Sequence, residues 1–177
     1  MHFVLSDAQT ARARFKGVSC TKFMWQFRIT KYDPNKRNEQ GHYLDKNEWT
    51  EYSDVGTSVS LSEYERVEKL YINAALELCS TAGAEYLYLT SLENYNKNCS
   101  FIEKQKIFLD QIELVLRQIL RGEYWAKLES ENAFIHIGYD YYMYIGTKEF
   151  NESAIWKIAE KGLYIEQMQS PYNEQDS

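Results

Sequence analysis

The fold is decided by the stretch Met24-Trp25-Gln26-Phe27-Arg28-Ile29-Thr30-Lys31-Tyr32-Asp33-Pro34. Apolar and polar side chains alternate over residues 25–31, which predicts a β-strand with one face on the core and the other in water. The turn-forming sequence Asp33-Pro34-Asn35 then ends the strand. We therefore expect the ordered domain to begin at about residue 24.

A long polar loop follows this strand and runs to Gly56. From Asp33 to Asp54 it carries six acidic and three basic residues, a net charge of −3, and its expected anchors are Tyr43 and Trp49. A loop of this length without regular structure is uncommon in a compact domain unless it serves function. Two interpretations stay open: an acidic, aromatic surface for a basic partner, or a solvated loop that Trp49 pins to the sheet.

Two long helices are predicted downstream of the loop. The first begins at Ser60, whose hydroxyl caps the first turn while Glu63 completes a capping box, and its apolar stripe extends to Leu78. The second is expected over residues 100–121, because the same Ser-x-x-Glu spacing opens it and a glycine follows it.

Further strands are expected at residues 85–91, 124–128, 133–138, 141–146 and 163–168. A short helix capped by Asn151 or Ser153 precedes the last of them. This order favours an α+β fold, in which an antiparallel or mixed sheet of about five to six strands packs with two long helices and one short helix. We expect a single domain over residues 24–168 and a polar C-terminal tail at 169–177. Residues 1–23 are expected to be an N-terminal extension, or else an added strand.

Composition narrows the class of protein. A chain of 177 residues that is 44% hydrophobic can bury the core of one domain. Its net charge of −6 disfavours a protein that mainly binds nucleic-acid backbone, which requires clustered Lys and Arg, and favours a basic protein partner. Residues 1–23 carry four basic residues and one acidic residue and lack a long apolar run. We therefore expect a cytoplasmic protein that makes no membrane contact.

The sequence lacks the usual motifs of catalysis and cofactor binding. Its eight glycines are scattered and form no phosphate-binding loop, and its three cysteines form no Cys-x-x-Cys pair. His136 lies between aliphatic neighbours and is interpreted as a hydrogen-bonded structural residue. A general base assisted by Asp140 or Glu131 is the alternative. We expect no catalytic residue, no cofactor and no metal.

The segment Tyr139-Asp140-Tyr141-Tyr142-Met143-Tyr144 concentrates four tyrosines in six positions. As a strand it would place Tyr139, Tyr141 and Met143 on one side and the other three residues on the opposite side. Tyrosine combines a large ring with a polar tip and is enriched in protein interfaces. The rings either pack against the helices or form a surface for a protein partner.

Five segments of the chain together resemble a known family. They are Lys31-Tyr32-Asp33-Pro34, Arg37-Asn38-Glu39, Glu48-Trp49-Thr50, Ser53-Asp54-Val55-Gly56 and Gly138-Tyr139-Asp140-Tyr141-Tyr142-Met143-Tyr144. Over residues 24–168 the chain resembles small bacterial proteins that are encoded beside polymorphic and contact-dependent growth-inhibition toxins and act as immunity proteins. The resemblance implies that the chain binds and neutralises a cognate toxin.

We expect this toxin to be a basic nuclease whose active site or substrate-binding surface the protein occludes. The expected partner-binding residues are Asp33, Arg37, Glu39, Tyr43, Glu48, Trp49, Asp54, Tyr139, Asp140 and Tyr142. The alternative is a small enzyme or nucleic-acid-processing protein, with a polar site formed by His136, Asp140, Tyr142 and Arg37. A structural or assembly module with a symmetric apolar face is a third interpretation.

Overall fold

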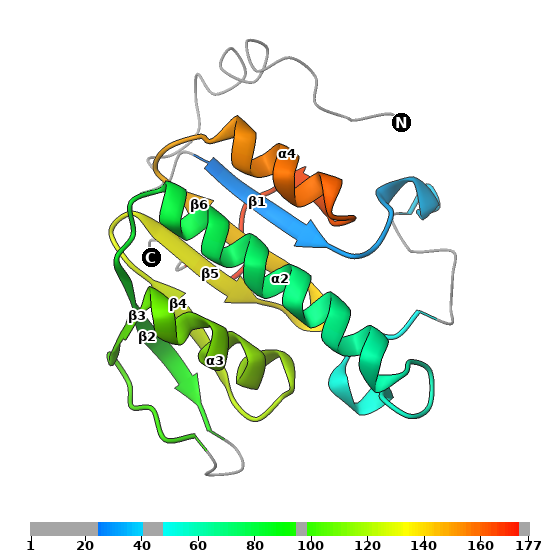
Figure 1. Cartoon of the computed structure of the whole chain (residues 1–177), viewed down its shortest axis with the longest axis horizontal. Coiled ribbons are helices and arrows are strands. Elements are labelled where there is room, and N and C mark those ends of the chain that lie inside the picture. Colours follow the sequence, from blue (N-terminus) through cyan, green and yellow to red (C-terminus); the bar gives the residue numbers. More distant parts are fainter. Residues whose placement is uncertain (1–24, 41–47, 95–98, 174–177) are drawn as a thin grey trace.

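The computed structural model describes residues 25–40, 48–94 and 99–173, and these form one seven-stranded sheet (Figure 1). The strand order is β3-β2-β4-β5-β6-β1-β7, and every neighbouring pair is antiparallel. The strands are β1 (Trp25–Thr30), β2 (Tyr86–Glu93), β3 (Lys106–Phe108), β4 (Trp125–Glu129), β5 (Ala133–Ile137), β6 (Met143–Thr147) and β7 (Tyr164–Gln167). The helices are α2 (Leu61–Thr81), α3 (Leu109–Leu120) and α4 (Glu152–Glu160). The predicted α+β class is confirmed, with slightly more strands than expected.

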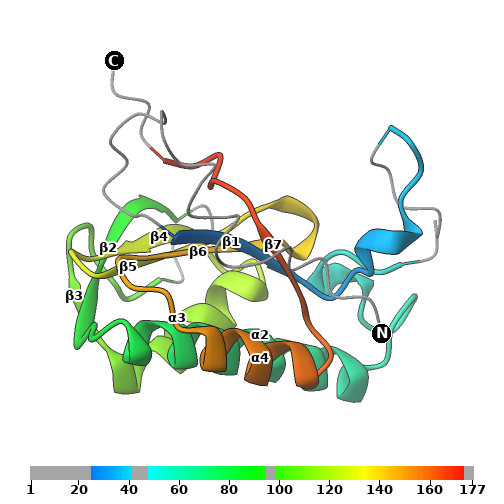
Figure 2. The ribbon, with the colours of Figure 1, turned by 90° about the horizontal axis from the view of Figure 1, so that it is seen from above.

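All three helices cover the same face of the sheet (Figure 2). The longest helix, α2, lies between the other two and packs on the central strands β5 and β6. It begins where the sequence predicts, because the Ser60 hydroxyl accepts a hydrogen bond from the Glu63 backbone N–H at 3.2 Å. Most of its apolar stripe is buried, with Tyr64 and Tyr71 both 0% exposed. Burial of this stripe against the sheet forms the main hydrophobic core.

Strand β1 confirms the predicted alternation but not the predicted exposure. Phe27 and Ile29 face the helices and belong to the core. Its polar side chains were expected to face water, yet Gln26, Arg28 and Thr30 are also buried. β1 lies between two neighbouring strands, and groups from the end of the chain bind its polar side chains. The strand is therefore covered on both faces.

The predicted second helix starts nine residues later than expected. Residues 106–108 form the short edge strand β3, and α3 begins at Leu109. The Glu103 carboxylate, expected in a helical capping box, accepts hydrogen bonds from the backbone N–H groups of Ser91 and Leu92 in β2. A buried Ile107 between two exposed neighbours suits an alternating strand as well as a helix, so the apolar pattern did not distinguish them.

Two further expectations near the C-terminus are corrected. Residues Tyr139–Tyr141 form a 3-10 turn, η3, before β6 begins at Met143, so the tyrosine segment is not one continuous strand. Residues 168–173, here called the C-terminal strap, were expected to belong mostly to a polar tail. They lie on the face of the sheet opposite the helices (Figure 2), and Ser170 is only 5% exposed.

Candidate partner-binding surface

The acidic loop and the tyrosine-rich turn meet at one end of the sheet. Figure 1 shows the two described parts of the loop, coloured blue and cyan, beyond the same end of the strands. The ring of Trp49 lies 5.0 Å from the ring of Tyr141, and the ring of Tyr32 lies 5.7 Å from that of Tyr142. The fold thus joins segments that are about 90 to 110 residues apart in the sequence. We call this region, made of residues 31–40, 48–56 and 138–142, the loop end.

Trp49 fastens the loop to the core. Its side chain is 8% exposed, and its ring also packs against Tyr64 of α2 at 5.2 Å. Its carbonyl oxygen accepts a hydrogen bond from the hydroxyl of Tyr32 at 3.1 Å. Of the two open interpretations for this residue, the structure therefore favours the one in which Trp49 pins the loop in place.

Several acidic residues of the loop serve its own structure. The carboxylates of Asp33 and Asp54 accept hydrogen bonds from backbone N–H groups of their own turns at 2.9 Å and 2.7 Å. Glu48 forms an ion pair with Lys31 at 2.7 Å. Glu39 is exposed, whereas Tyr43 lies outside the described residues. These carboxylates give the loop its shape, and those that reach solvent also give this end of the molecule negative charge.

The turn η3 presents two exposed side chains on a constrained backbone. Tyr139 is 86% exposed and Asp140 is also exposed, whereas Tyr141 is 4% exposed. Asp140 and Tyr141 have φ angles of 56° and 61°. This left-handed conformation is tolerated by Asp but strained for a bulky residue such as Tyr. The buried Tyr141 ring, which contacts three other aromatic rings, holds the turn in that conformation.

Arg37 and Tyr142 belong to an ion-pair cluster beside the turn. Glu166 of β7 binds both Arg28 of β1 at 2.7 Å and Arg37 of the loop at 2.9 Å. The Arg28 guanidinium lies 4.7 Å from the centre of the Tyr142 ring, a cation–π contact. Burial alone would raise the pKa of Glu166, but the hydrogen bonds from the two arginines outweigh it and lower that pKa. Arg37 therefore ties the loop to the sheet edge.

His136 lies on the same sheet face but is enclosed. It is 0% exposed; its Nε2 lies 3.0 Å from Glu129 and its Nδ1 lies 2.8 Å from the Ser170 hydroxyl. Because an ionised carboxylate only accepts hydrogen bonds, Nε2–H donates to Glu129, and Nδ1 of the neutral ring accepts from Ser170. Burial lowers the pKa of His136 and outweighs the opposing effect of Glu129. The ring is thus neutral at pH 7.

This arrangement differs from the polar site proposed as the alternative. Glu131, one expected partner of the imidazole, instead binds Lys148 at 2.7 Å, and Asp140 lies on the exposed turn. Ser170, His136 and Glu129 follow the order of a hydrolase triad. However, a buried imidazole and a buried hydroxyl give a substrate no access in this conformation. We therefore interpret the group as a hydrogen-bonded network that holds the C-terminal strap on the sheet.

The residues that the sequence reasoning missed are Ser170, Glu129 and Glu166. Strand alternation could have placed Glu129 and Lys127 on the face of His136, since Lys127 pairs with His136 in the β4–β5 register. No neighbouring residue in the sequence indicates that Ser170 or Glu166 takes part in these contacts. Their partners, His136 and Arg28, are 34 and 138 positions away in the sequence.

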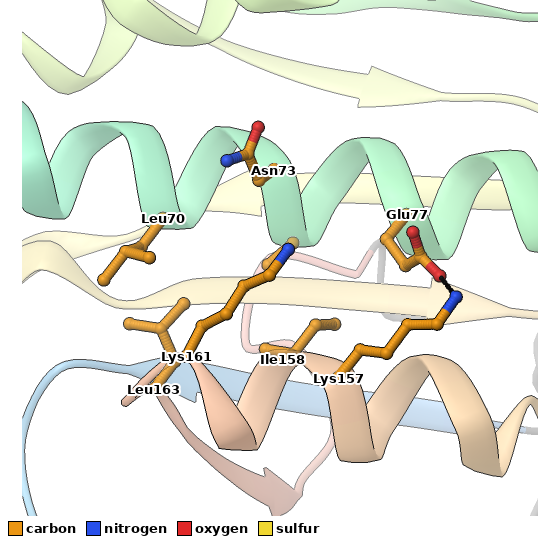
Figure 3. A pocket seen from close by; sticks show the side chains of 8 residues that line it. Leu70, Asn73, Glu77, Lys157, Ile158, Lys161 and Leu163 are labelled. Atoms are coloured by element: carbon orange, nitrogen blue, oxygen red, sulfur yellow. Dashed lines mark hydrogen bonds and ion pairs between the residues drawn. The ribbon is translucent and has the colours of Figure 1, made fainter.

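Within the described residues, no group of three or more His, Cys, Asp or Glu side chains is placed to hold a metal ion. Burial raises the pKa of the Cys79 thiol to about 12, so it stays protonated at neutral pH. None of the helices described here combines the length and apolar character needed to cross a membrane. A hollow between α2 and α4 (Figure 3) has a volume of ≈ 10 Å³, about enough for one water molecule.

In comparisons with known proteins, no family model, curated protein or solved structure matches this chain. The features of this chain that bear on function are therefore the loop end and the sequence segments that resemble immunity proteins.

Proposed function

We propose that this protein is a bacterial immunity protein that binds and neutralises a cognate toxin, a basic nuclease, by covering its active site or substrate-binding surface. The sequence resemblance to immunity proteins supports this function. The net charge of −6 supports a basic partner, because opposite charges speed association and disfavour wrong partners.

One observation carries the proposal: the loop end presents exposed aromatic and acidic groups beside two buried aromatic anchors. Trp49 and Tyr141 are buried and lock its two halves together at 5.0 Å, while Tyr139, Asp140 and Glu39 remain exposed. A partner that meets a pre-ordered surface does not have to order it on binding, so more of the contact energy appears as affinity. Such a surface suits tight inhibition.

The first test is co-expression of this chain with any toxin-like domain that a gene immediately upstream encodes. If the proposal holds, the two proteins co-purify as a stable complex and cells that express the toxin grow. Absence of both complex and growth rescue would refute the immunity function and direct attention to chemistry around His136. A toxin domain from an unrelated gene pair serves as the specificity control and should neither co-purify nor be neutralised.

Variants of Trp49 and Asp54 are poor probes of this function. Trp49 is in the core, and the Asp54 carboxylate holds the backbone of its own turn. A loss of binding in Trp49→Ala or Asp54→Lys would therefore mix a folding defect with a lost contact. Exposed residues of the loop end separate the two effects.

A further inference from the structure

On the basis of the proposed function, we infer that the turn Gly138–Tyr142 enters the substrate cleft of the nuclease and takes the place of a nucleotide. The Tyr139 ring would occupy the position of a base, and the Asp140 carboxylate the position of a phosphate. This inference selects direct active-site occlusion over coverage of a neighbouring surface.

The ring of Tyr139 lies in solvent. Its ring is 86% exposed, whereas Tyr141 and Tyr144 in the same segment are 4% and 7% exposed. Folding thus buries other rings of this segment and leaves one in solvent at its tip. An exposed tyrosine on a fixed turn has the properties of an interface anchor, since it brings a large contact area and loses little rotamer freedom on binding.

The constrained backbone is the second step. Two consecutive residues other than glycine, Asp140 and Tyr141, have positive φ angles, and this conformation costs a bulky residue such as Tyr141 roughly 1–3 kcal/mol. Two hydrogen bonds close the turn: Gly138 N–H donates to the Tyr142 carbonyl at 2.7 Å, and Tyr142 N–H donates to the Tyr139 carbonyl at 3.2 Å. Strain of this kind persists where the surroundings enforce it, and it is concentrated at functional sites.

The chemistry of the two exposed groups is the third step. Nucleases hold phosphates with Lys and Arg and stack bases on aromatic or guanidinium planes. Adjacent residues that offer a flat ring and a carboxylate supply both features of a nucleotide at neighbouring positions.

The test measures binding of the purified toxin domain identified by co-expression. We compare the wild-type protein with Tyr139→Ala, with Asp140→Asn, and with Tyr88→Ala as a matched control. Tyr88 is a partly exposed tyrosine of β2, 39% exposed, and it lies outside the loop end. Asn tolerates the left-handed conformation, so Asp140→Asn removes the charge and keeps the turn. Thermal unfolding verifies that each variant is folded.

We expect Tyr139→Ala to weaken the affinity by about 30-fold or more, the size of an interface hot spot. Asp140→Asn should weaken binding and reduce its dependence on salt, and Tyr88→Ala should bind as the wild type does. An uncleavable phosphorothioate oligonucleotide should compete with the wild-type protein for the toxin. If wild-type protein binds and rescues growth but Tyr139→Ala binds within about threefold of it, or if a ternary complex with the oligonucleotide forms, the inference is overturned and the immunity function stands. If the wild-type protein does not bind the toxin, both the inference and the proposed immunity function fail.

Discussion

At Gly146 of β6 the sheet has no room for a side chain. This residue faces Phe134 of β5 in the register, and a Cβ atom there would overlap the Phe134 ring. We expect Gly146→Ala to lower the free energy of unfolding by about 1–3 kcal/mol, because the ring must leave its preferred position. Urea denaturation measures the change.

A double-mutant cycle provides the control for this prediction. Phe134→Leu alone removes ring contacts and destabilises the protein, but combined with Gly146→Ala it makes space for the new methyl group. The double variant should therefore be more stable than the sum of the two single effects predicts. Simple additivity would mean that the Phe134 ring is not the obstacle.

The neutral state of His136 makes stability depend on pH. Its pKa is lowered below the ordinary value of 6.5, mainly by burial, so the unfolded chain takes up a proton more readily than the folded one. Stability should thus fall as the pH drops from 7 through 6.5 towards 5. Glu129 also has a lowered pKa, but its ordinary value of 4.5 places its effect at lower pH.

The measurement is the urea midpoint at pH 8, 7, 6 and 5 for the wild-type protein and for His136→Gln. The variant should be less stable at pH 8, because it loses the bonds to Ser170 and Glu129, and it should lose less stability between pH 7 and 5. Parallel curves for the two proteins would show that His136 does not titrate on unfolding.

At the residue scale, local signals foretold some positions and not others. The cap at Ser60 and the hydrogen bonding of His136 followed from neighbouring residues, and both are confirmed. The left-handed Tyr141 could not be foretold, because tyrosine disfavours that conformation and only tertiary packing enforces it. The sequence did not show which candidate contact residues of the loop are buried and which are exposed. The fold shows this, since it places Trp49 in the core.

At the element scale, Glu166 joins three pieces of structure. It binds Arg28 in the neighbouring strand β1 and Arg37 in the loop, and its side chain is 23% exposed. Glu166→Gln would remove the carboxylate that the two partly buried guanidinium groups of Arg28 and Arg37 share. We expect the free energy of unfolding to fall by about 1–3 kcal/mol at pH 7.

Glu160→Gln at the end of α4 is the matched control, since Glu160 is exposed and the same charge is removed. This control should stay within about 0.5 kcal/mol of the wild type in urea denaturation. Equal effects of the two substitutions would mean that net charge, and not the Arg28–Glu166–Arg37 cluster, determines the result.

The elements that the sequence predicted well are those with their own start and stop signals. Helices α2 and α4 have side-chain caps at Ser60 and Asn151, and β4, β5 and β6 form the expected meander. Strand β3 was missed because three residues carry too little pattern to outweigh a helical alternative, and its existence depends on pairing with β2. Local propensity therefore failed where tertiary contacts decided the structure.

At the scale of the whole molecule, the helices and the C-terminal strap cover opposite faces of one sheet (Figure 2). The helix face follows from apolar periodicity, which sequence reasoning reads directly. The covering of the other face does not follow from any local pattern. Gln26, at the start of β1, binds the strap through hydrogen bonds that span about 145 positions in the sequence. The polar composition of the C-terminus predicted an unpacked polar tail. Composition alone cannot predict contacts with residues so far away in the sequence.

Deletion of residues 169–177 tests whether the strap is part of the fold. It would remove Ser170 from His136 and Tyr172 from the rings of Trp125 and Tyr144. We expect the free energy of unfolding to fall by about 2–4 kcal/mol, from lost apolar burial and from the loss of the Ser170 partner of His136 Nδ1. Urea denaturation followed by tryptophan fluorescence reports the change. A chain that ends at Asn173 retains every described strap contact and should remain within about 0.5 kcal/mol of the full protein. Equal stability of the 168-residue chain and the full protein would contradict a structural role for the strap, because the buried His136–Ser170 bond would then contribute nothing to folding.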